Sequence, residues 1–479
     1  MSIARKILIA LLVLLVVGGI LLFFLSRGDT AEMSVNDVSG TDQTLEDHNA
    51  ESVPTIQIAE PVGWEEGDKP VAAEGLEVVR FAEGLDHPRV IHTLPNGDVL
   101  VTLTRSPKSE GGGGITAWIA EKLMTTAGAV GDSANELILL RDGDGDGVAE
   151  TQNVIMDELD SPSGIAWRDG KLYVANHDSV IAVDYALGDE KVTAEPKKLM
   201  DLPPGGGHWM RNMELHPTRP ELYIAVGSVS NIGEHGMEIE KDRAMIHQLN
   251  LETGRSRPFG LGLRNPNGLD FSPWTGTLWT TVNERDMLGS DLVPDYLTDV
   301  PIGAQYGWPW VYWAMRFDER VEHPRPQFLT EYTRKPAFAL GPHVAALGLV
   351  FTKEGHLMGD KFGSGAFIAR HGSWNRKPPS GYDVIYVAYD ENGNPVGKPV
   401  DVLTGFLNDD GTTKGRPTWV EWAGDGALLM SDDTAGIIWR VVATGAAPGA
   451  GITPLETGSL PPTRELKGDP RDAFEEPPE

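Results

Sequence analysis

The most regular pattern in the chain is a strand pair that recurs six times between residues 87 and 433. Each copy has a Pro or Asn-Pro, a short apolar run, a turn that usually contains Gly, and a second run rich in aromatic and β-branched residues. Turn pairs such as Asn-Gly and Asp-Gly between two such runs predict β-hairpins. The six expected hairpins span 87–102, 161–175, 211–227, 265–282, 346–369 and 416–433.

These repeats predict an all-β fold, and in particular the closed ring of a six-bladed β-propeller. Radial repetition protects the edges of the sheets, and residues 67–444 leave each blade room for four strands and a long loop. An ordinary pair of β-sandwiches is the alternative. Because ligands of propellers typically sit on the ring axis, candidate chemistry is sought in the loops between hairpins.

A different pattern precedes the repeats. Residues 7–25 are 19 uncharged residues, nearly all Leu, Ile, Val, Ala or Phe, and they follow Arg5 and Lys6. This run is long enough to cross a bilayer, and the positive charges before it keep the N-terminus cytoplasmic. Residues 1–28 are therefore predicted as a transmembrane or signal helix, with retention and cleavage both open. The propeller is then expected in the periplasm, anchored to the inner membrane, or outside the cell.

Two flanking segments lack hydrophobic periodicity. Residues 29–66 contain ten acids and no Lys or Arg, which is typical of a disordered tether. Residues 445–479 contain Pro-Pro pairs at 461–462 and 477–478 and are predicted as a Pro/Gly-rich disordered tail.

Composition excludes several functions. The 479 residues carry 40 basic and 70 acidic side chains, a net charge of −30, and no Cys. The charge disfavours nucleic-acid binding, and the missing Cys excludes disulfides, Cys-ligated metals and a Cys nucleophile. No Gly-x-Gly-x-x-Gly between a strand and a helix, no P-loop and no Gly-x-Ser-x-Gly elbow supports NAD(P), ATP or serine-hydrolase chemistry.

Two groups of polar residues stand at hairpin entrances. His208 follows the Gly-Gly-Gly run 205–207, where it can act as a general base or as a structural hydrogen-bonding group. Arg264, Asn265 and Asn267 open the fourth hairpin in GLRNPNG. A guanidinium fork beside amides suits recognition of a carboxylate or a quinone oxygen, although an Asx-stabilised turn explains the asparagines equally well.

Two further loops follow hairpins. NERDMLGSD (283–291) is rich in oxygen ligands for a hard cation, or is simply a solvated loop, and its candidates are Glu284, Arg285, Asp286 and Asp291. ARHGSWNRKPPSGYDV (369–384) is a basic and aromatic cluster in an acidic protein and therefore a candidate anion site, with His371 and Arg376 as its main residues.

A possible structural calcium loop lies earlier in the chain. DGDGDG (142–147) places Asp142, Asp144 and Asp146 at the first, third and fifth ligand positions of an EF-hand loop. The twelfth position is Asn153, so the bidentate Glu is missing. A plain acidic turn is the alternative.

The order of these motifs resembles the glucose/sorbosone dehydrogenase family, six-bladed propellers that depend on pyrroloquinoline quinone (PQQ), and is closest to its L-sorbosone dehydrogenase-like branch. The resemblance covers roughly residues 75–443. It is carried by FAEGLDHPR, GGGHW, LYIAVGS, GLRNPNGLDFSPWTGTLW, YGWPW, HGSWNR and GRPTWVEWAGDGALLMSDD.

The resemblance implies roles for the matching residues. His208 would be the general base that takes the hydroxyl proton while hydride passes to the quinone. Arg264, Asn265 and Asn267 would bind the cofactor near its reactive carbonyl, with Arg264 stabilising the developing oxyanion. Arg416 would pair with a cofactor carboxylate, and the loop with His371 and Arg376 would supply another cationic contact.

Calcium is the second cofactor that the resemblance implies. Glu284, Arg285 and Asp286 would contact PQQ and the ion, partly through backbone carbonyls, and Ca²⁺ would polarise the quinone. The chain departs from the family pattern at Asn267, where Gln is common, and at Arg285–Asp286, where Gly and Pro are common. It also has Gly227–Ser228 where relatives have Gly-Asp.

The expected function is therefore oxidation of an aldose-type sugar or sugar aldehyde, with a quinone or cytochrome as electron acceptor. Two alternatives remain on the same architecture: a non-catalytic propeller that binds a glycan or a protein, and a calcium-dependent lactonase.

Overall fold

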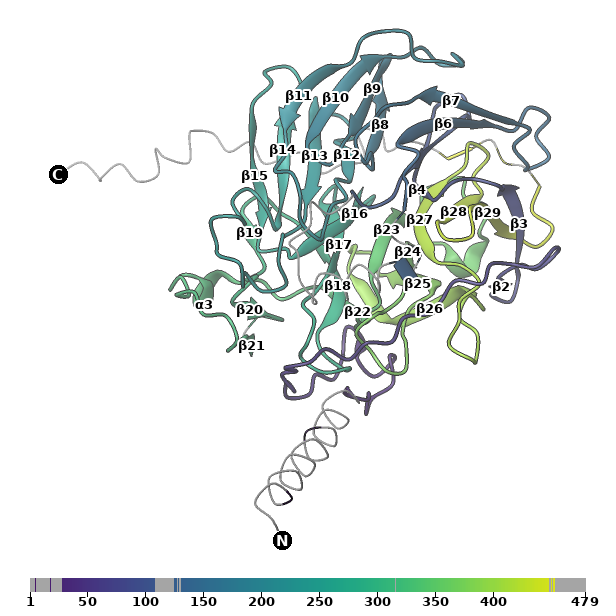
Figure 1. Ribbon diagram of the computed structural model, residues 1–479. Coiled ribbons are helices and arrows are strands. Elements are labelled where there is room, and N and C mark those ends of the chain that lie inside the picture. The colour runs from purple at the N-terminus through teal and green to yellow at the C-terminus, as the bar shows by residue number, and fades with distance from the viewer. Residues whose placement is uncertain are drawn as a thin grey trace.

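The computed structural model describes residues 28–107, 131–314 and 316–447, with residues 5, 18, 125, 126, 128, 449, 451 and 452 as isolated points. Six antiparallel sheets follow one another along the chain (Figure 1). Blade 1 has β4 (Pro88–Thr93), β5 (Val99–Leu103), β6 (Glu136–Arg141) and β7 (Thr151–Met156). Blade 2 has β8 (Ile165–Arg168), β9 (Lys171–Ala175), β10 (Ser179–Asp184) and β11 (Lys197–Asp201). Blade 3 has β12 (Met213–Leu215), β13 (Glu221–Val226), β14 (Met245–Asn250) and β15 (Ser256–Leu261).

The second half repeats the plan. Blade 4 has β16 (Asn265–Phe271), β17 (Leu278–Asn283), β18 (Pro294–Asp299) and β22 (Phe338–Pro342). Blade 5 has β23 (Ala346–Phe351), β24 (Gly365–Arg370), β25 (Asp383–Tyr389) and β26 (Pro395–Thr404). Blade 6 has β27 (Pro417–Trp422), β28 (Leu428–Asp432), β29 (Ile437–Ala443) and, from the start of the body, β3 (Leu76–Ala82). The predicted six-bladed propeller is confirmed, and each expected hairpin forms the first two strands of a blade.

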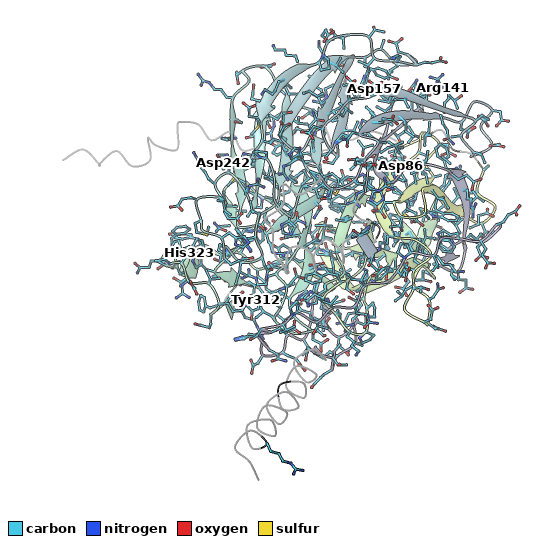
Figure 2. The ribbon with its side chains drawn as sticks, in the orientation of Figure 1. Asp86, Arg141, Asp157, Asp242, Tyr312 and His323 are labelled. Carbon is cyan, nitrogen blue, oxygen red and sulfur yellow. The ribbon has the colours of Figure 1, made fainter. Side chains whose placement is uncertain are left out.

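Short additions decorate the ring. β19 (Ala304–Gln305) joins blade 3, β1 (Ser39–Gly40) joins blade 4 and β2 (Val71–Ala72) joins blade 5. β20 (Val311–Tyr312) pairs with β21 (Arg316–Phe317), followed by α3 (Leu329–Tyr332), and a 3-10 turn covers Asp360–Phe362. In Figure 2 the labelled Tyr312 and His323 mark this insertion at one edge of the ring, away from Arg141 of blade 1.

The first strands of neighbouring blades approach too closely for a side chain at three junctions. A Cβ on Gly164, Gly268 or Gly348 would lie 2.4–2.6 Å from the next blade, against Met213, the Leu347 carbonyl and the Trp419 Cα. This is why Gly stands near the start of the second, fourth and fifth hairpins. The contact brings the loops that precede the first strands close around one axis.

Ring closure joins the two ends of the body. β3 pairs antiparallel with β29 from Ile438↔Ala82 to Ala443↔Leu76. The pairing satisfies the backbone groups that two open sheet edges would expose. Trp439, at the centre of β29, is fully buried in the core between blades 5 and 6.

Residues 28–66, which we call the N-terminal strap, lie against the ring. Val38 and Ala59 are fully buried, and β1 pairs with β22. Backbone hydrogen bonds run from Ala31 N to Lys377 O (2.8 Å) and from Gln57 N to Trp374 O (2.9 Å). The prediction of a disordered tether is therefore wrong here, because backbone groups rather than an apolar face attach the strap.

The two remaining predictions for the ends of the chain concern the N-terminal helix and the C-terminal tail. The expected apolar helix and most of the expected tail, from residue 453, lie outside the described residues. Among the residues that are described, no helix has the length and hydropathy needed to span a bilayer.

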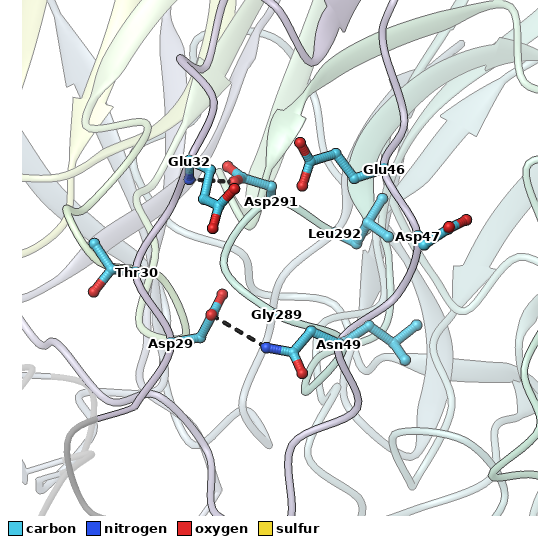
Figure 3. Close-up of a pocket in the computed structure, with 10 residues that line it drawn as sticks. Asp29, Thr30, Glu32, Glu46, Asp47, Asn49, Gly289, Asp291 and Leu292 are labelled. Atoms are coloured by element: carbon cyan, nitrogen blue, oxygen red, sulfur yellow. Dashed lines mark hydrogen bonds between the residues drawn. The ribbon is translucent and has the colours of Figure 1, made fainter. Parts of the chain in front are cut away.

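A cavity of about 110 Å³ separates part of the strap from the loop after β17 (Figure 3). Its carboxylates come from Asp29, Glu32, Glu46, Asp47 and Asp291. The Glu32 N–H donates to Asp291 Oδ2 at 2.6 Å, and Asn49 Nδ2 donates to Asp29 Oδ1 at 3.3 Å. Such a lining repels anions, so an anionic ligand has to be sought elsewhere.

Ionisable side chains cluster at the ends of several first strands, where each strand turns into the second. Lys353 Nζ lies 3.7 Å from Asp270 Oδ1 and also interacts electrostatically with Glu214 and Glu421. Burial raises the pKa of Glu421 to about 7, although the charge of Lys353 opposes the shift. Three acids and one lysine therefore share a poorly solvated space.

We expect Glu421→Gln to reduce the pH dependence of the free energy of unfolding between pH 4.5 and about 7. The folded state raises the pKa from 4.5 to about 7, so it holds this proton more tightly than the unfolded chain does. The resulting stability is complete below pH 4.5 and is lost as the pH rises to 7. Urea unfolding at several pH values measures the effect, and an unchanged slope in the variant would contradict it.

Candidate functional site

The predicted site residues outside the DGDGDG loop gather on one face of the ring. In each blade, the loop before the first strand and the loop after the second strand open on the same side, because the two strands are antiparallel. His208, Arg264 and Arg416 precede β12, β16 and β27, whereas Glu284–Asp291 and His371–Arg376 follow β17 and β24. We call this side the axial face.

His208 is held as a neutral base. Its Nδ1 lies 2.9 Å from the Ser228 carbonyl oxygen, which can only accept a hydrogen bond, so Nδ1 carries the hydrogen and donates it. Within the described residues nothing hydrogen-bonds to Nε2, whose lone pair is therefore available. Burial, reinforced by the charge of Arg264, lowers the pKa of His208 to about 3.

Gly227 lets His208 and Asn265 meet. A Cβ there would lie 2.5 Å from the His208 Cβ and 2.4 Å from Asn265 Oδ1. Asn265 and Asn267 both donate to Asn283 Oδ1, at 3.1 and 3.2 Å. The predicted asparagines therefore form an amide network beside the base.

Arg264 is saturated by the protein itself. Its Nε donates to Asn231 O, Nη1 to the carbonyls of Asn283 and Glu284, and Nη2 to Asn231 Oδ1 and Asp286 Oδ2. A guanidinium has five N–H groups, and all are used. The predicted contact of Arg264 with a cofactor oxygen would require one of these bonds to break.

Asp286 joins Arg264 to His343, a residue that the sequence did not single out. Burial alone would raise the pKa of Asp286, but Arg264 and His343 outweigh it and lower the value. Burial likewise disfavours charged His343, yet its hydrogen bond to Asp286 (3.3 Å) raises its pKa. The three groups form a charge-paired unit.

A second unit is centred on Asp433. Its Oδ2 accepts from Arg89 and from His371 Nε2 (2.9 Å), and lies 3.4 Å from His87 Nε2. Burial opposes the charged carboxylate, but His371, His87 and Arg89 hold the pKa of Asp433 well below its usual value. Arg89 also donates to Met210 Sδ at 2.8 Å, which connects this unit to the segment carrying His208.

Sequence reasoning missed His87, Arg89 and Asp433. The first two stand at a hairpin entrance, in HPR, as Arg264 does in RNP and Arg416 does in GRP. Aligning the six hairpin entrances would have revealed them. Asp433, immediately after β28, carried no comparable signal.

Arg416 retains capacity for an anion. It is 5% exposed, its Nη2 donates to the strap carbonyl of Ala59 at 3.1 Å, and its guanidinium lies 5.1 Å from the centre of the Tyr382 ring. In the described chain no carboxylate lies within 4.0 Å of the guanidinium nitrogens, although Asp432 Oδ1 accepts from the Arg416 backbone N–H at 2.8 Å. Its Nε has no hydrogen-bond partner, and neither do Arg89 Nε and Asp433 Oδ1.

Several predicted ligand residues are already committed to protein partners. Arg376 pairs with Asp291 (3.2 Å) and donates to the strap carbonyl of Met33 (3.0 Å). The Glu284 carboxylate accepts from Arg285 Nε at 3.0 Å, and the Arg285 side chain is fully buried. The predicted cofactor roles of Glu284 and Arg376, and the metal roles of Arg285, Asp286 and Asp291, would require some of these bonds to break, and they stay predictions.

The predicted calcium loop DGDGDG brings four acidic side chains close together, and calcium binding there stays a prediction. Asp142, Asp144 and Asp146 form a group with Glu150 whose ligand atoms lie within 4.8 Å of one another. Glu150, and not Asn153, is the fourth residue of this group. The loop connects β6 to β7 on the side opposite the axial face, so any ion there would be structural.

These observations define a six-bladed propeller with a buried, charge-paired site on one face. The chain belongs to the TrAA12-like family, whose model matches residues 70–299 and 321–444. An uncharacterized protein of Borreliella burgdorferi is 29% identical over 301 residues, covering 59% of this chain and 76% of the relative.

Two solved structures are similar to this chain in fold. The calcium structure of the Trichoderma reesei Carbohydrate-Active Enzymes Family AA12 protein has a TM-score of 0.63 and 19% identity, covering 81% of this chain and 99% of its own. The holo PQQ domain of the pyranose dehydrogenase of Coprinopsis cinerea has a TM-score of 0.61 and 20% identity, covering 80% and 100%. Over 128 residues, 22% of this chain and 16% of that enzyme, the sequence identity is 31%.

The resemblance to PQQ-dependent sugar dehydrogenases is thereby confirmed, and these structural likenesses establish the fold. The L-sorbosone branch stays a prediction.

We expect Gly227→Ala to lower the unfolding free energy by ~1–3 kcal/mol, because the new methyl group forces His208 or Asn265 to move. Gly207→Ala is the matched control, since the nearest atom to its Cβ would be the Val229 oxygen at 3.8 Å. Denaturant unfolding of both variants measures the difference. Equal unfolding free energies for Gly227→Ala and Gly207→Ala would show that there is room for a methyl group between Gly227 and its neighbours His208 and Asn265.

Proposed function

We propose that this protein is an oxidoreductase that oxidises a pyranose or another aldose-type sugar with PQQ as its cofactor. The observation that carries the proposal is the state of His208, a base with a free Nε2, on the same face as the partly unpaired Arg416. The family match and the 31% identity to a PQQ-dependent pyranose dehydrogenase support it.

The donor set fits an anionic cofactor. PQQ carries three carboxylates, and the unpartnered N–H groups of Arg416 and Arg89 are buried. Hydrogen bonds between charged groups in such a place are strong because little water competes. Arg416 would hold a cofactor carboxylate, with the Asp433 unit beside it fixing the positions of Arg89 and His371.

His208 would take the proton of the sugar hydroxyl at Nε2. Its bond to Ser228 keeps the ring oriented, and its lowered pKa keeps it unprotonated through the physiological range. The bound quinone supplies the acceptor for the hydride of the sugar carbon. Asn265, next to His208, offers an amide to orient the hydroxyl.

We also propose that the protein is exported and attached to the membrane, and that a quinone or a cytochrome accepts its electrons. The aldose-type substrate and the membership of the L-sorbosone dehydrogenase-like branch are likewise proposals. An axial calcium is not part of this proposal.

We expect His208→Gln to lower PQQ-dependent dye reduction at least ~100-fold, because a proton acceptor is lost and general-base catalysis contributes about that much. The control is His235→Gln, at an exposed position. The measurement is kcat with a panel of aldoses, alongside circular dichroism to verify folding. Full activity in His208→Gln would rule out its role as the base.

We expect Arg416→Met to weaken PQQ binding at least ~10-fold, because a charged hydrogen bond contributes about 1.5–3 kcal/mol. Arg255→Met removes an exposed guanidinium as the matched control. Quenching of tryptophan fluorescence during a PQQ titration gives the Kd. Equal affinities in both variants would place the cofactor elsewhere.

A further inference from the structure

In the loop that the family resemblance assigns to calcium, three backbone oxygens accept hydrogen bonds from guanidinium groups. Glu284 O accepts from Arg264 Nη1 at 2.6 Å. Asp286 O and Met287 O accept from Arg320 Nη1 at 3.0 and 2.8 Å. Two guanidinium groups thus bind the carbonyls at the place where a divalent cation is expected.

The side-chain oxygens of the loop are engaged as well. Asp286 Oδ2 pairs with Arg264 at 2.9 Å, and its Oδ1 lies 3.3 Å from His343 Nδ1. Asp291 Oδ2 accepts from the backbone of the strap at 2.6 and 3.1 Å. Ca²⁺ needs six to eight oxygen ligands, so this loop does not fit it as folded.

Electrostatics lead to the same conclusion. Arg264 pairs with Asp286, and Arg320, itself paired with Asp318, donates to two loop carbonyls. Side-chain exposure is only 6% for Arg264 and 19% for Arg320. A doubly charged ion placed among them would meet two cations in a region of poor solvation. It would also have to displace hydrogen bonds that are charge-assisted.

Arg320 belongs to a stretch that the family model does not match. The match stops at residue 299 and resumes at residue 321. Asp318 fixes the Arg320 guanidinium through bonds of 2.9 Å to Nε and 2.7 Å to Nη2. The same stretch supplies Trp308, whose Nε1 donates to Asn231 O, and the Val311 carbonyl, which accepts from Arg285. The insertion is thus built onto the loop.

We propose that Arg264 and Arg320 take the place of a divalent cation on the axial face, so that this protein binds its anionic ligand without calcium. The identity of that ligand rests on the proposed function, whereas the claim about the metal does not. In this respect the protein would differ from the Trichoderma reesei Family AA12 protein, for which a calcium structure has been solved.

The first experiment separates the axial loop from the DGDGDG loop. The variant Asp142→Asn/Asp144→Asn/Asp146→Asn removes three carboxylates of the opposite side. Calcium titration by calorimetry should then show no binding below millimolar concentrations, and thermal unfolding should be the same in Ca²⁺ and in EGTA. A micromolar calcium site that survives in this variant and disappears when Asp286→Asn is added would overturn the proposal.

The second experiment restores space for the ion. Arg320→Gln releases the carbonyls of Asp286 and Met287, so Ca²⁺ should raise the Tm of this variant by several degrees in the triple-Asn background. Arg325→Gln, which removes an exposed guanidinium a few residues further along the chain, should show no such response. No response of Arg320→Gln to Ca²⁺ would show that Arg320 does not occupy a cation position.

A PQQ titration links the two claims while keeping them distinguishable. The Kd should change less than twofold between Ca²⁺ and EGTA, and a loss of binding in EGTA that Ca²⁺ restores would contradict calcium independence. If PQQ fails to bind under every condition, the proposed function is wrong. Calorimetry and Tm still decide the metal question in that case.

Discussion

The structure depends on the seam between β3 and β29, where the two ends of the propeller body pair. Asp432, at the end of the neighbouring β28, ties this seam to both the strap and the site. It accepts from Trp64 Nε1 at 2.9 Å, from Trp439 Nε1 at 3.4 Å and from the Arg416 N–H at 2.8 Å. Trp64 in turn packs edge-on against Trp439. One buried carboxylate therefore connects the closing seam, the strap and the backbone of Arg416.

Ring closure also explains why polar side chains from distant parts of the sequence meet on the axial face. Each site side chain stands at the beginning of a first strand or just after a second strand, so only a closed ring makes residues from blades 1, 5 and 6 neighbours. Arg89 and Asp433 are 344 positions apart and share one hydrogen bond. Because the carboxylate is buried, leaving either partner alone would be costly, and the pair fixes the geometry around His371.

The fold could be predicted because its signal is local. Each hairpin combines alternating apolar runs with a turn of Gly, Asn or Asp, and the Gly at several junctions follows from the close packing of first strands. The strap could not be predicted, because its acidic sequence has no apolar period and its attachment uses backbone groups such as Ala31 N and Ala59 O. Partnerships in the site escaped prediction for a related reason. Sequence placed Arg264 and Asp286 on the correct face but could not show that they neutralise each other.

The pattern of paired charges determines the sign of the ligand. The chain carries a net charge of −30, yet on the axial face Arg264, Arg89 and Arg376 each have a buried carboxylate partner. Arg416 has a carbonyl and an aromatic ring instead. In a region of poor solvation an unpaired guanidinium attracts an anion strongly, while a loop already neutralised by arginines offers little to a cation. Carboxylates pair with Arg264, Arg89 and Arg376 but not with the Arg416 guanidinium, and Arg264 and Arg320 donate to several oxygens of the loop 283–291. The same arrangement of charges therefore favours both proposals, an anionic cofactor and a loop without a metal.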